Sequence, residues 1–478
     1  MTRARGSSGE LALVLHTHMP YVEGYGTWPF GEEWLWEALA TSYLPLLDLL
    51  AGRSEQRLTI SLTPVLCDQL ETLSGPAGER FLGFLSDVRE VSHQRDIEGL
   101  ERGGEPGLAA ELERAAGDYR LAAERFEAHG RDLLAAFQPY AAWTSAATHA
   151  VLPLCATDAG VRAQVCCGIA AHRRRFGARW RGGFWLPECA HAPFLDPLLR
   201  AAGVSATCVD LTDVLGLGAD ANLTPLRAQG GPLLVPIDRA TIELVWSDDG
   251  YPANGAYRDY HHHTIHHHRP WANSSEPYDH AAALALAREH ASDFVERVRR
   301  RLDQAATRRG GPGLLVCALD TELLGHWWYE GTAWLEGVLD EADDQGLELV
   351  ALDDALARHE PAPAPAELPV TTWGTPRDLS TWDGPAIAEL VWRARAAELD
   401  LIAAGREVGA RALRELLALQ SSDWAFMITH DLAAPYGIER ADGHSAALRS
   451  ALAQLDSGPD GGPRNLAPDC SPALLMTP

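Results

Sequence analysis

The chain has 478 residues, 46% hydrophobic and 22% charged, a composition typical of a globular protein larger than one ordinary domain. Acidic residues outnumber basic ones by 66 to 40, and the formal charge of −26 disfavours binding to nucleic acid or to anionic membrane surfaces. All basic residues are arginines, which excludes Schiff-base lysines, Walker-type phosphate lysines and carbamylated-lysine metal bridges.

Short apolar runs, typical of buried parallel strands, recur along the chain and end at polar residues. The predicted strands are residues 11–15, 58–62, 182–186, 205–209, 233–236 and 313–319. Helix-forming segments rich in Ala, Leu and Arg, such as residues 281–304, separate several of them. This alternation predicts an α/β fold with a parallel sheet, and polar residues just past the strand ends are typical of the active sites of α/β barrels. We therefore predict a barrel.

Composition also predicts the domain organisation. Residues 82–135 are rich in charged helix formers and predict a helical insertion in the barrel. A linker-like Pro-Ala stretch predicts that the barrel, residues 1–365, is followed by a C-terminal helical domain, residues 366–478. The tail from residue 457 is rich in Gly, Pro and Asp, and we expect it to be loosely held.

The cysteines and the first residues bear on the compartment. The eight cysteines show no CxxC spacing, so we expect reduced, mostly buried thiols in a cytoplasmic protein. The polar N-terminus leads into only five apolar residues before His16, and we expect no signal peptide. No apolar run approaches the length of a membrane span.

Two stretches each place a carboxylate among tryptophans just after an apolar run. They read GFWLPECAH at residues 183–191 and ALDTELLGHWWYEG at residues 318–331. Cleavage of a glycosidic bond needs two acids, and flat rings stack on sugar faces, whereas buried ion pairs beside core aromatics are the alternative. Glu188 and Asp320 are the candidate catalytic pair, and Glu322 is the competing acid of the second stretch.

Histidines accompany this pair. His16 and His18 share one face of a strand end and suit a metal or hydrogen bonds to sugar hydroxyls, with structural histidines as the alternative. His149 follows small residues and is a weak signal alone. A rival function is therefore a metal-dependent hydrolase or deacetylase built from these histidines and Asp320. A binding or scaffold protein that has kept the pocket is a second alternative.

Five segments, in order along the chain, resemble the signatures of glycoside hydrolase family 57 and, within it, of the branching enzymes. They are residues 16–21, 144–149, 184–191, 319–331 and 421–427, so the resemblance spans about residues 11 to 430. It implies a (β/α)7 barrel whose C-terminal helical domain contributes to the substrate cleft. It also implies a retaining mechanism, with Glu188 as the nucleophile and Asp320 as the general acid/base.

The resemblance implies a substrate and its contacts as well. The implied contacts are His16, His18, Trp28, His149, Tyr251, Arg269, Trp271, Trp373, Trp382, Asp423 and Trp424. Core packing is the alternative for the tryptophans. The implied partner is an α-glucan, cleaved at an α-1,4 bond and transferred to a 6-hydroxyl to form α-1,6 branches; an α-glucan hydrolase or 4-α-glucanotransferase is the alternative. We expect no metal or other cofactor, and a monomer or small homo-oligomer.

The sequence departs from the family in the loop that we expect to cover the cleft. This loop, residues 250–257, offers Tyr251 or Tyr257 as the covering side chain and begins GYPAN, where branching enzymes tend to read GYPGD. Six histidines follow within residues 261–268. They suit adventitious zinc or nickel, but a solvated loop lengthened without function is the preferred interpretation. The departures leave the balance between transfer and hydrolysis open.

Overall fold

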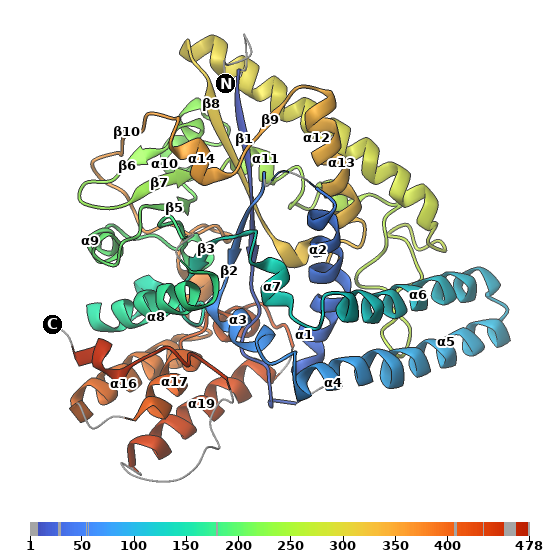
Figure 1. Ribbon diagram of the computed structural model, residues 1–478, viewed down its shortest axis with the longest axis horizontal. Helices are drawn as coiled ribbons and strands as arrows, with labels where there is room; N and C mark the ends of the chain where they lie inside the picture. Colours follow the sequence, from blue (N-terminus) through green and yellow to red (C-terminus); the bar gives the residue numbers. More distant parts are fainter. Residues whose placement is uncertain are drawn as a thin grey trace.

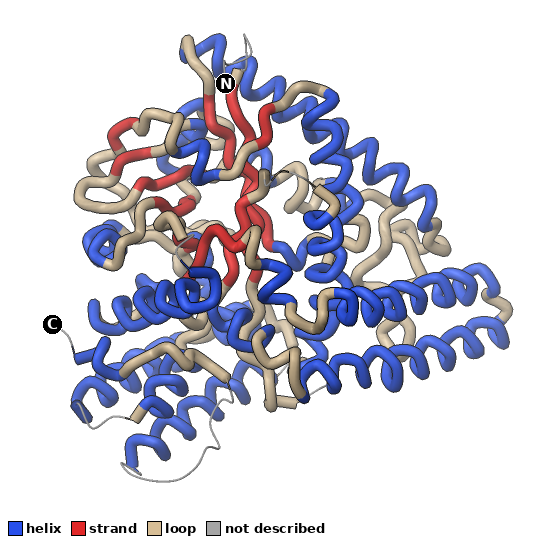
Figure 2. The backbone as a smooth tube through the Cα atoms, in the orientation of Figure 1, coloured by secondary structure: helices blue, strands red, loops and turns tan. Residues whose placement is uncertain are grey.

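Parallel strands form the centre of the molecule, and helices surround them (Figures 1 and 2). The computed structural model describes residues 8–26, 30–53, 55, 57–177, 180–405, 409–433, 435–453 and 465–476. The strands are β1 (Gly9–Thr17), β2 (Thr59–Leu62), β3 (Ala141–Ser145), β4 (Phe184–Trp185), β5 (Ala206–Val209), β6 (Leu226–Arg227), β7 (Leu233–Pro236), β8 (Gly313–Asp320), β9 (Glu348–Leu349) and β10 (Ala362–Pro363).

Two sheets continue into each other and close the predicted (β/α)7 barrel. One sheet has the strand order β4-β3-β2-β1-β8 with β9 beside β1, and the other has the order β10-β6-β7-β5. A parallel bridge between Gly183 and Ala206 joins β4 to β5, and the amide of Asp238 donates to the carbonyl of Val316 over 2.8 Å beyond the end of β7. The prediction of an α/β barrel is confirmed.

The strands that the apolar runs predict are mostly buried on both faces, as in β1, β2, β5 and β8. Every residue of β1 is buried, and β1 pairs in parallel with β2 and β8. Each of the predicted runs overlaps a strand. Strand β3 was not predicted, because its sequence, AAWTS, lacks a marked apolar run. The predicted helix at residues 281–304 lies within α12 (His280–Arg309), whose N-cap Asp279 accepts a hydrogen bond from the amide of Ala282.

Helices cover the outside of the barrel and extend it at two places (Figure 1). The other helices around the barrel are α1 (Glu32–Ala38), α2 (Leu44–Ala51), α3 (Pro64–Leu70), α4 (Pro76–Gly83), α7 (Leu133–Phe137), α8 (Asp158–Phe176), α9 (Asp196–Ala201), α10 (Thr212–Leu215), α11 (Arg239–Ile242), α13 (Gly331–Asp344) and α14 (Leu352–Leu356). None of the helices in the described residues is both long and apolar enough to span a membrane.

The first extension is a helical hairpin inside the predicted insertion. Helices α5 (Glu90–Gly103) and α6 (Pro106–Ala128) lie side by side and project from the barrel (Figure 1). The chain reverses at Gly104, whose φ of 80° is readily adopted only by glycine. Buried ion pairs between Arg89 and Glu37 and between Arg258 and Glu111 attach the hairpin to the body.

The second extension is the C-terminal helical region, drawn in orange and red in Figure 1. It contains α15 (Ser380–Asp383), α16 (Ala388–Ala404), α17 (Ala410–Leu419), α18 (Ser422–Thr429) and α19 (Tyr436–Ala453). An isolated bridge between Ala150 and Ser421 joins it to the segment after β3. The domain boundary between residues 365 and 366 stays a prediction.

The end of the chain is fastened more tightly than its composition predicts. Cys167 in α8 forms a disulfide with Cys470, 303 residues later, so the expectation of reduced thiols is wrong for this pair, and the other six cysteines are free. The amide of Ala467 also donates to Asp68 over 2.7 Å. The expectation of a loose tail is therefore wrong for residues 465–476, whereas residues 457–464 lie outside the described residues. Sequence spacing does not indicate a pairing over so long a separation.

Candidate active site

A large cavity of about 1660 Å³ opens at the carboxyl ends of the barrel strands. Ligand pockets for drug-sized molecules are usually about 300 to 1,000 Å³, so this cavity has room for an oligomeric ligand. Among the sequence-predicted residues, those that line it are His16, His18, His149, Glu188, Arg269, Asp320, Trp373, Trp382 and Asp423. The structure therefore brings both members of the candidate catalytic pair to one cavity.

The barrel strands place these side chains together. His16 lies opposite Asp320 in the register of β1 and β8, so the first histidine and the second acid are neighbours at one edge of the barrel. Strand β3 is followed four residues later by His149, and β4 is followed three residues later by Glu188. Because the strands are parallel, their carboxyl ends meet at the same edge, as in other α/β barrels.

The backbone is strained where two of these residues lie. His149 has a φ of 61° and Glu188 a φ of 60°, a left-handed conformation that is uncommon for residues other than glycine. Backbone hydrogen bonds hold both turns, because the amide of Ser422 donates to the carbonyl of His149 over 3.1 Å and that of Trp373 donates to the carbonyl of Glu188 over 3.0 Å. Such strain is typical of functional positions.

Two hydrogen bonds fix the carboxyl group of Glu188. The Ser422 hydroxyl donates to Oε1 over 2.8 Å, and the Trp373 indole donates to Oε2 over 3.1 Å. Burial raises the pKa of Glu188 above its ordinary value, while these two hydrogen bonds and the charge of His18 oppose the increase. The two donors therefore favour the ionised form that a nucleophile needs.

A chain of hydrogen bonds leads from Ser422 back into the barrel. The Ser422 hydroxyl lies 2.8 Å from Nδ1 of His149, whose Nε2 lies 2.9 Å from Nε2 of His16. With Nδ1–H of His149 donating to Ser422, the serine proton is directed at Glu188, and Nε2 of His149 accepts from His16. Burial, followed by the charges of neighbouring histidines, lowers the pKa of both His16 and His149 well below its ordinary value, so neutral rings suit this arrangement.

Asp320 lies in an environment that favours the protonated form of its carboxyl group. Burial, followed by the charges of Glu322 and Glu188, raises the pKa of Asp320 well above its ordinary value. Among the described residues, no donor is hydrogen-bonded to its carboxyl group. Asp320 therefore keeps its proton at a pH where an ordinary aspartate has lost it, which is the state of a general acid.

Glu322, the competing acid, accepts hydrogen bonds from other groups of the protein. Its Oε1 accepts a hydrogen bond from the hydroxyl of Tyr43 and another, 3.1 Å long, from the amide of His18. Burial is the main cause that raises its pKa to about 7, and the Tyr43 hydrogen bond opposes this increase. Glu322 fixes the end of β1 against the turn after β8, so Asp320 remains the better candidate for the acid.

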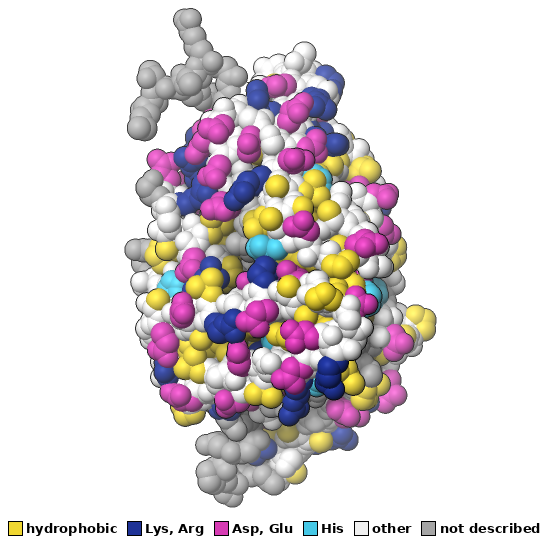
Figure 3. Space-filling model, turned by 90° about the vertical axis from the view of Figure 1, so that its right-hand side faces the viewer, with side chains coloured by type: hydrophobic (Ala, Val, Ile, Leu, Met, Phe, Trp, Pro, Cys, Tyr) yellow, Lys and Arg dark blue, Asp and Glu magenta, His cyan; other side chains and the backbone are white. Residues whose placement is uncertain are grey.

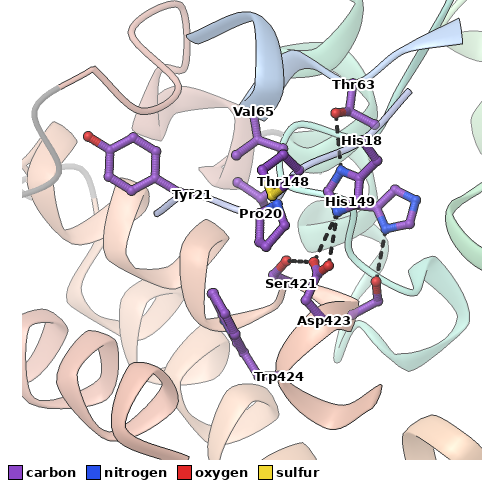
Figure 4. A network of polar contacts seen from close by, with 12 residues as sticks. His18, Pro20, Tyr21, Thr63, Val65, Thr148, His149, Ser421, Asp423 and Trp424 are labelled. Atoms are coloured by element: carbon purple, nitrogen blue, oxygen red, sulfur yellow. Dashed lines mark hydrogen bonds and ion pairs between the residues drawn. The ribbon is translucent and has the colours of Figure 1, made fainter. Parts of the chain in front are cut away.

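His18 and Asp423 form an ion pair at the border between the barrel and α18 (Figure 4). Nε2 of His18 lies 3.0 Å from Oδ2 of Asp423, which also accepts a 2.6 Å hydrogen bond from Ser421, and Nδ1 of His18 lies 3.1 Å from the hydroxyl of Thr63. Burial would lower the pKa of His18, but Asp423 raises it; burial would likewise raise the pKa of Asp423, but His18 lowers it to about 2. The pair is therefore charged near neutral pH.

Among the described residues, one group of side chains has the spacing of metal ligands, and it includes His18 and Asp423. Ligand atoms of His18, His149 and Asp423 lie within 4.8 Å of one another. However, both nitrogens of each histidine already have hydrogen-bond partners, and the two rings stack at 3.9 Å rather than converging on a common point. Asp320 does not belong to the cluster, so the ligand set of the rival metal-dependent hydrolase is not assembled.

Of the predicted substrate contacts, three do not line the cavity, and a fourth is not described. Trp28 lies outside the described residues. Tyr251, the predicted covering side chain, donates from its hydroxyl to Asp293 of α12 over 2.7 Å. Trp271 stacks on His262 with ring centroids 3.8 Å apart. Trp424 is fully buried.

Core and loop packing account for these placements. The Trp424 indole donates to the carbonyl of Ala418 over 2.7 Å, and Tyr257, the other candidate for the covering side chain, is fully buried beside His290. Trp373 and Trp382 reach the cavity, although Trp382 is only 2% exposed.

Sequence reasoning missed several residues of this site. Ser422 was overlooked although it precedes the predicted Asp423, and Tyr43 carried no signal because it lies in a helical segment far from any motif. Tyr260 and Trp327 also line the cavity. Tyr260 lies between the predicted covering loop and the histidine run, and Trp327 stands inside residues 318–331, which were noted for Asp320. The aromatic content of those stretches was the signal that could have found them.

Comparisons with known proteins agree with this geometry. The profile of glycosyl hydrolase family 57 matches residues 142–366, and that of the 1,4-alpha-glucan branching enzyme C-terminal domain matches residues 386–461. A probable 1,4-alpha-glucan branching enzyme of Mycobacterium tuberculosis is 32% identical over 519 residues, covering 98% of this chain and 96% of the relative.

The chain is also similar to branching enzymes of two archaea. A 1,4-alpha-glucan branching enzyme of Thermococcus kodakarensis is 32% identical over 499 residues, covering 91% of this chain and 72% of the relative. The crystal structure of a GH57-type branching enzyme from Pyrococcus horikoshii superposes with a TM-score of 0.88 at 28% identity, covering 98% of this chain and 97% of that one. The strand-end carboxylates, the five signatures and these matches together show that the chain belongs to glycosyl hydrolase family 57.

Proposed function

We propose that this protein is a 1,4-α-glucan branching enzyme that works by retention through a covalent glycosyl-enzyme. The observation that carries the proposal is the contrast between two carboxyl groups in one cavity. Glu188 accepts two hydrogen bonds that favour its charge, whereas the half-buried Asp320 has no such donor among the described residues and retains its proton. A retaining enzyme needs one ionised and one protonated acid at the start of its cycle.

In the first step, Glu188 attacks the anomeric carbon of a glucose unit in the α-1,4 chain. The bond between this carbon and the leaving O4 breaks, and Asp320 gives its proton to that oxygen. The sugar is then joined to Glu188 through an ester bond, and Asp320 is ionised. The charge of Glu188, which raises the pKa of Asp320 before the reaction, disappears with the ester, so Asp320 can ionise more easily.

In the second step, the 6-hydroxyl of another glucan chain attacks the same carbon. Asp320 takes the hydroxyl proton, the ester bond breaks, and Glu188 leaves as a carboxylate. Two displacements at one carbon retain its configuration, so the new linkage is α-1,6. If water replaces the hydroxyl, the outcome is hydrolysis, which is the alternative activity within the same family.

The remaining side chains have supporting roles in this proposal. His16 and His149 direct the serine hydroxyl to Glu188, and the charged pair of His18 and Asp423 offers polar atoms to sugar hydroxyls. Other cavity-lining residues are proposed to contact the glucan through stacking or hydrogen bonds. They are Trp373, Trp382 and Arg269.

A neutral polysaccharide suits the charge of this protein. Acidic and arginine side chains are mixed over the face drawn in Figure 3, and no broad basic area is visible there. With a formal charge of −26, the protein would repel a phosphate backbone but not a glucan. An α-glucan in the cytoplasm is therefore the proposed partner.

Product analysis on amylose tests the activity. We expect new α-1,6 linkages, counted after debranching or by proton NMR, to exceed the reducing ends that are released. More reducing ends than α-1,6 linkages would overturn branching in favour of hydrolysis. Incubation with a 5-fluoro glycosyl fluoride should label Glu188, located by mass spectrometry of peptides, and the absence of a label together with full activity of Glu188→Gln would overturn the catalytic pair.

A chelator separates this proposal from the metal-dependent rival. We expect activity on amylose to be unchanged after dialysis against EDTA, because the proposed chemistry uses carboxyl groups only. Activity that is lost on dialysis and restored by zinc would favour the rival, with His18, His149 and Asp423 as the ligands.

A further inference from the structure

Three side chains form a stack on one wall of the cavity. The rings of Tyr260 and Trp327 are nearly parallel, 17° apart, with centroids separated by 5.1 Å. The guanidinium of Arg269 lies 3.9 Å from the centroid of Tyr260. Trp327 is 39% exposed, and all three residues line the cavity. The stack thus presents a large aromatic ring to the cavity on a fixed support.

Arg269 has the features of a binding group rather than of a surface charge. Among the described residues it has no ion-pair partner, although acidic residues outnumber basic ones in this chain by 66 to 40. Its hydrogen bond to the carbonyl of His326 is 3.4 Å long and leaves further N–H groups available. A guanidinium held by stacking keeps its donors free for hydroxyl groups in the cavity.

The histidine-rich run holds this stack in place. It belongs to the loop between α11 and α12, which reaches α5 of the helical insertion (Figure 1). Nδ1 of His266 donates to Asp96 of α5 over 2.6 Å, and Thr264 donates to the same carboxylate. His268 is buried, packs against His93 with the rings tilted by 31°, and lies 3.1 Å from the hydroxyl of Ser92.

The interpretation of this run as a solvated loop is therefore wrong for His268, because its ring packs against α5. We call the contacts of Thr264, His266 and His268 with Asp96 and Ser92 the histidine clasp. The clasp joins the loop that carries Tyr260 and Arg269 to α5 of the helical insertion.

The stack lies on the side of the cavity that carries Asp320. The amide of Trp327 donates to the carbonyl of Glu322 over 3.2 Å, so the ring is attached to the turn that directly follows Asp320. In a retaining transfer, the acid/base residue acts first on the departing oxygen and then on the entering one. Sugars on this side therefore belong to the leaving chain in the first step and to the acceptor chain in the second.

We propose that the exposed face of Trp327, supported by Tyr260 and Arg269 and positioned by the histidine clasp, binds a glucose unit of the acceptor glucan. This inference rests on the proposed function and assigns its acceptor side. The ligand class is an α-1,4-linked glucose chain, whose apolar ring faces stack on the indole while its hydroxyls accept from Arg269. A bound acceptor excludes water, so the platform favours transfer over hydrolysis.

The test separates the two chemical steps with an activated donor. Maltosyl fluoride forms the glycosyl-enzyme, measured as fluoride release, and added maltooligosaccharide then competes with water for it. In Trp327→Ala we expect the acceptor concentration for half-maximal transfer to rise about tenfold, as for loss of one well-packed aromatic contact. Fluoride release without acceptor should be unchanged, and Trp327→Phe should recover part of the loss.

Matched variants complete the experiment. Trp392→Ala removes a tryptophan that is 66% exposed on α16, outside the cavity lining, and should leave acceptor use as in the parent protein. Asp96→Asn weakens the clasp far from the catalytic pair and should raise the half-maximal acceptor concentration in the same direction, by less than Trp327→Ala.

The outcomes are distinct. If the parent protein forms no glycosyl-enzyme, the proposed function fails. If it does, and Trp327→Ala and Trp327→Phe both keep the acceptor dependence of the parent protein, the platform is overturned while the proposed function stands. If only Asp96→Asn is without effect, the role of the clasp is overturned and the platform stands.

Discussion

The two ends of the cavity are built in different ways. At the catalytic end, Asp320 and His16 lie on adjacent barrel strands, and Glu188 and His149 occupy turns directly after strands. The second end adjoins the first on the side of Asp320, and its stack of Tyr260, Trp327 and Arg269 is held by a loop and by the helical insertion. The first end depends on the sheet and the second on segments added to it.

This difference separates two tasks of a transferase. Bond cleavage tolerates little displacement of the reacting groups, and the buried strands hold them rigidly. The choice between water and a sugar hydroxyl depends on what the surrounding loops bind, and loops vary without disturbing the sheet. Variants at the catalytic end should therefore stop the reaction, and variants at the insertion end should redirect it.

The largest effect is expected from Glu188→Gln, which breaks the catalytic end outright. Removal of the proposed nucleophile should lower fluoride release from maltosyl fluoride by at least about 10³-fold. A matched control is Glu243→Gln, because Glu243 lines the same cavity but has no assigned role, and it should retain the rate of the parent protein. Comparable losses in both variants would mean that the cavity, and not Glu188 itself, was damaged.

Asp320→Asn should distinguish the two substrates. Loss of the proposed general acid should lower cleavage of amylose by about 10²- to 10⁴-fold, whereas fluoride leaves without a proton and its release should change much less. Since the pKa of Asp320 is raised, amylose cleavage by the parent protein should decline as the pH rises through this pKa. The decline should be absent from the residual activity of the variant, and its persistence there would assign it to another group.

Ser422→Ala tests whether the C-terminal region tunes the nucleophile. The Ser422 hydrogen bond lowers the pKa of Glu188, so its loss should raise that pKa further above its ordinary value. Because Glu188 is proposed to act as a carboxylate, the acidic limb of fluoride release should move to higher pH by the same amount. The rate on the high-pH plateau should change little.

Ser422→Thr, which keeps a hydroxyl, should restore the acidic limb. A uniform loss of rate at every pH in Ser422→Ala would indicate a structural role only. The groups that face Glu188 besides Ser422 and Trp373 are His149, His18, Asp423 and Asp320, and they are the same in both variants.

The smallest effect on activity is expected far from both ends of the cavity, at the disulfide of Cys167 and Cys470. Cys470→Ser should lower the free energy of unfolding by about 2 to 4 kcal/mol, because the crosslink closes a long loop in the unfolded chain. Fluoride release at 25 °C should be unchanged, and residues 465–476 should become accessible to a protease. An unchanged unfolding midpoint under oxidising conditions would argue against the crosslink.

The sequence predicts the catalytic end because each part of it is contiguous. An apolar run, the acid that follows it and the neighbouring tryptophans lie within about ten residues of one another, as in residues 183–191. The contacts that tune this end are not local. Ser422 reaches Glu188 across 234 residues, and no spacing rule indicates such a pair.

The tryptophans show the same limit of prediction from sequence. Trp424 and Trp373 are both among the implied substrate contacts, yet the first is fully buried and the second lines the cavity beside Glu188. Side-chain type does not distinguish these positions, because helix packing decides which face is covered. Strand β3 escaped notice for a related reason, since alanine-rich strands have no strong signature.

The position of Ser422 in the chain has a consequence for biosynthesis. Proteins emerge from the ribosome N-terminus first, so the barrel segments that carry Glu188 and Asp320 are made well before α18. Until the hydroxyl at position 422 arrives, Glu188 lacks one of its two hydrogen-bond donors. The hydrogen-bonding environment of Glu188 is therefore complete only when synthesis of the chain is nearly finished.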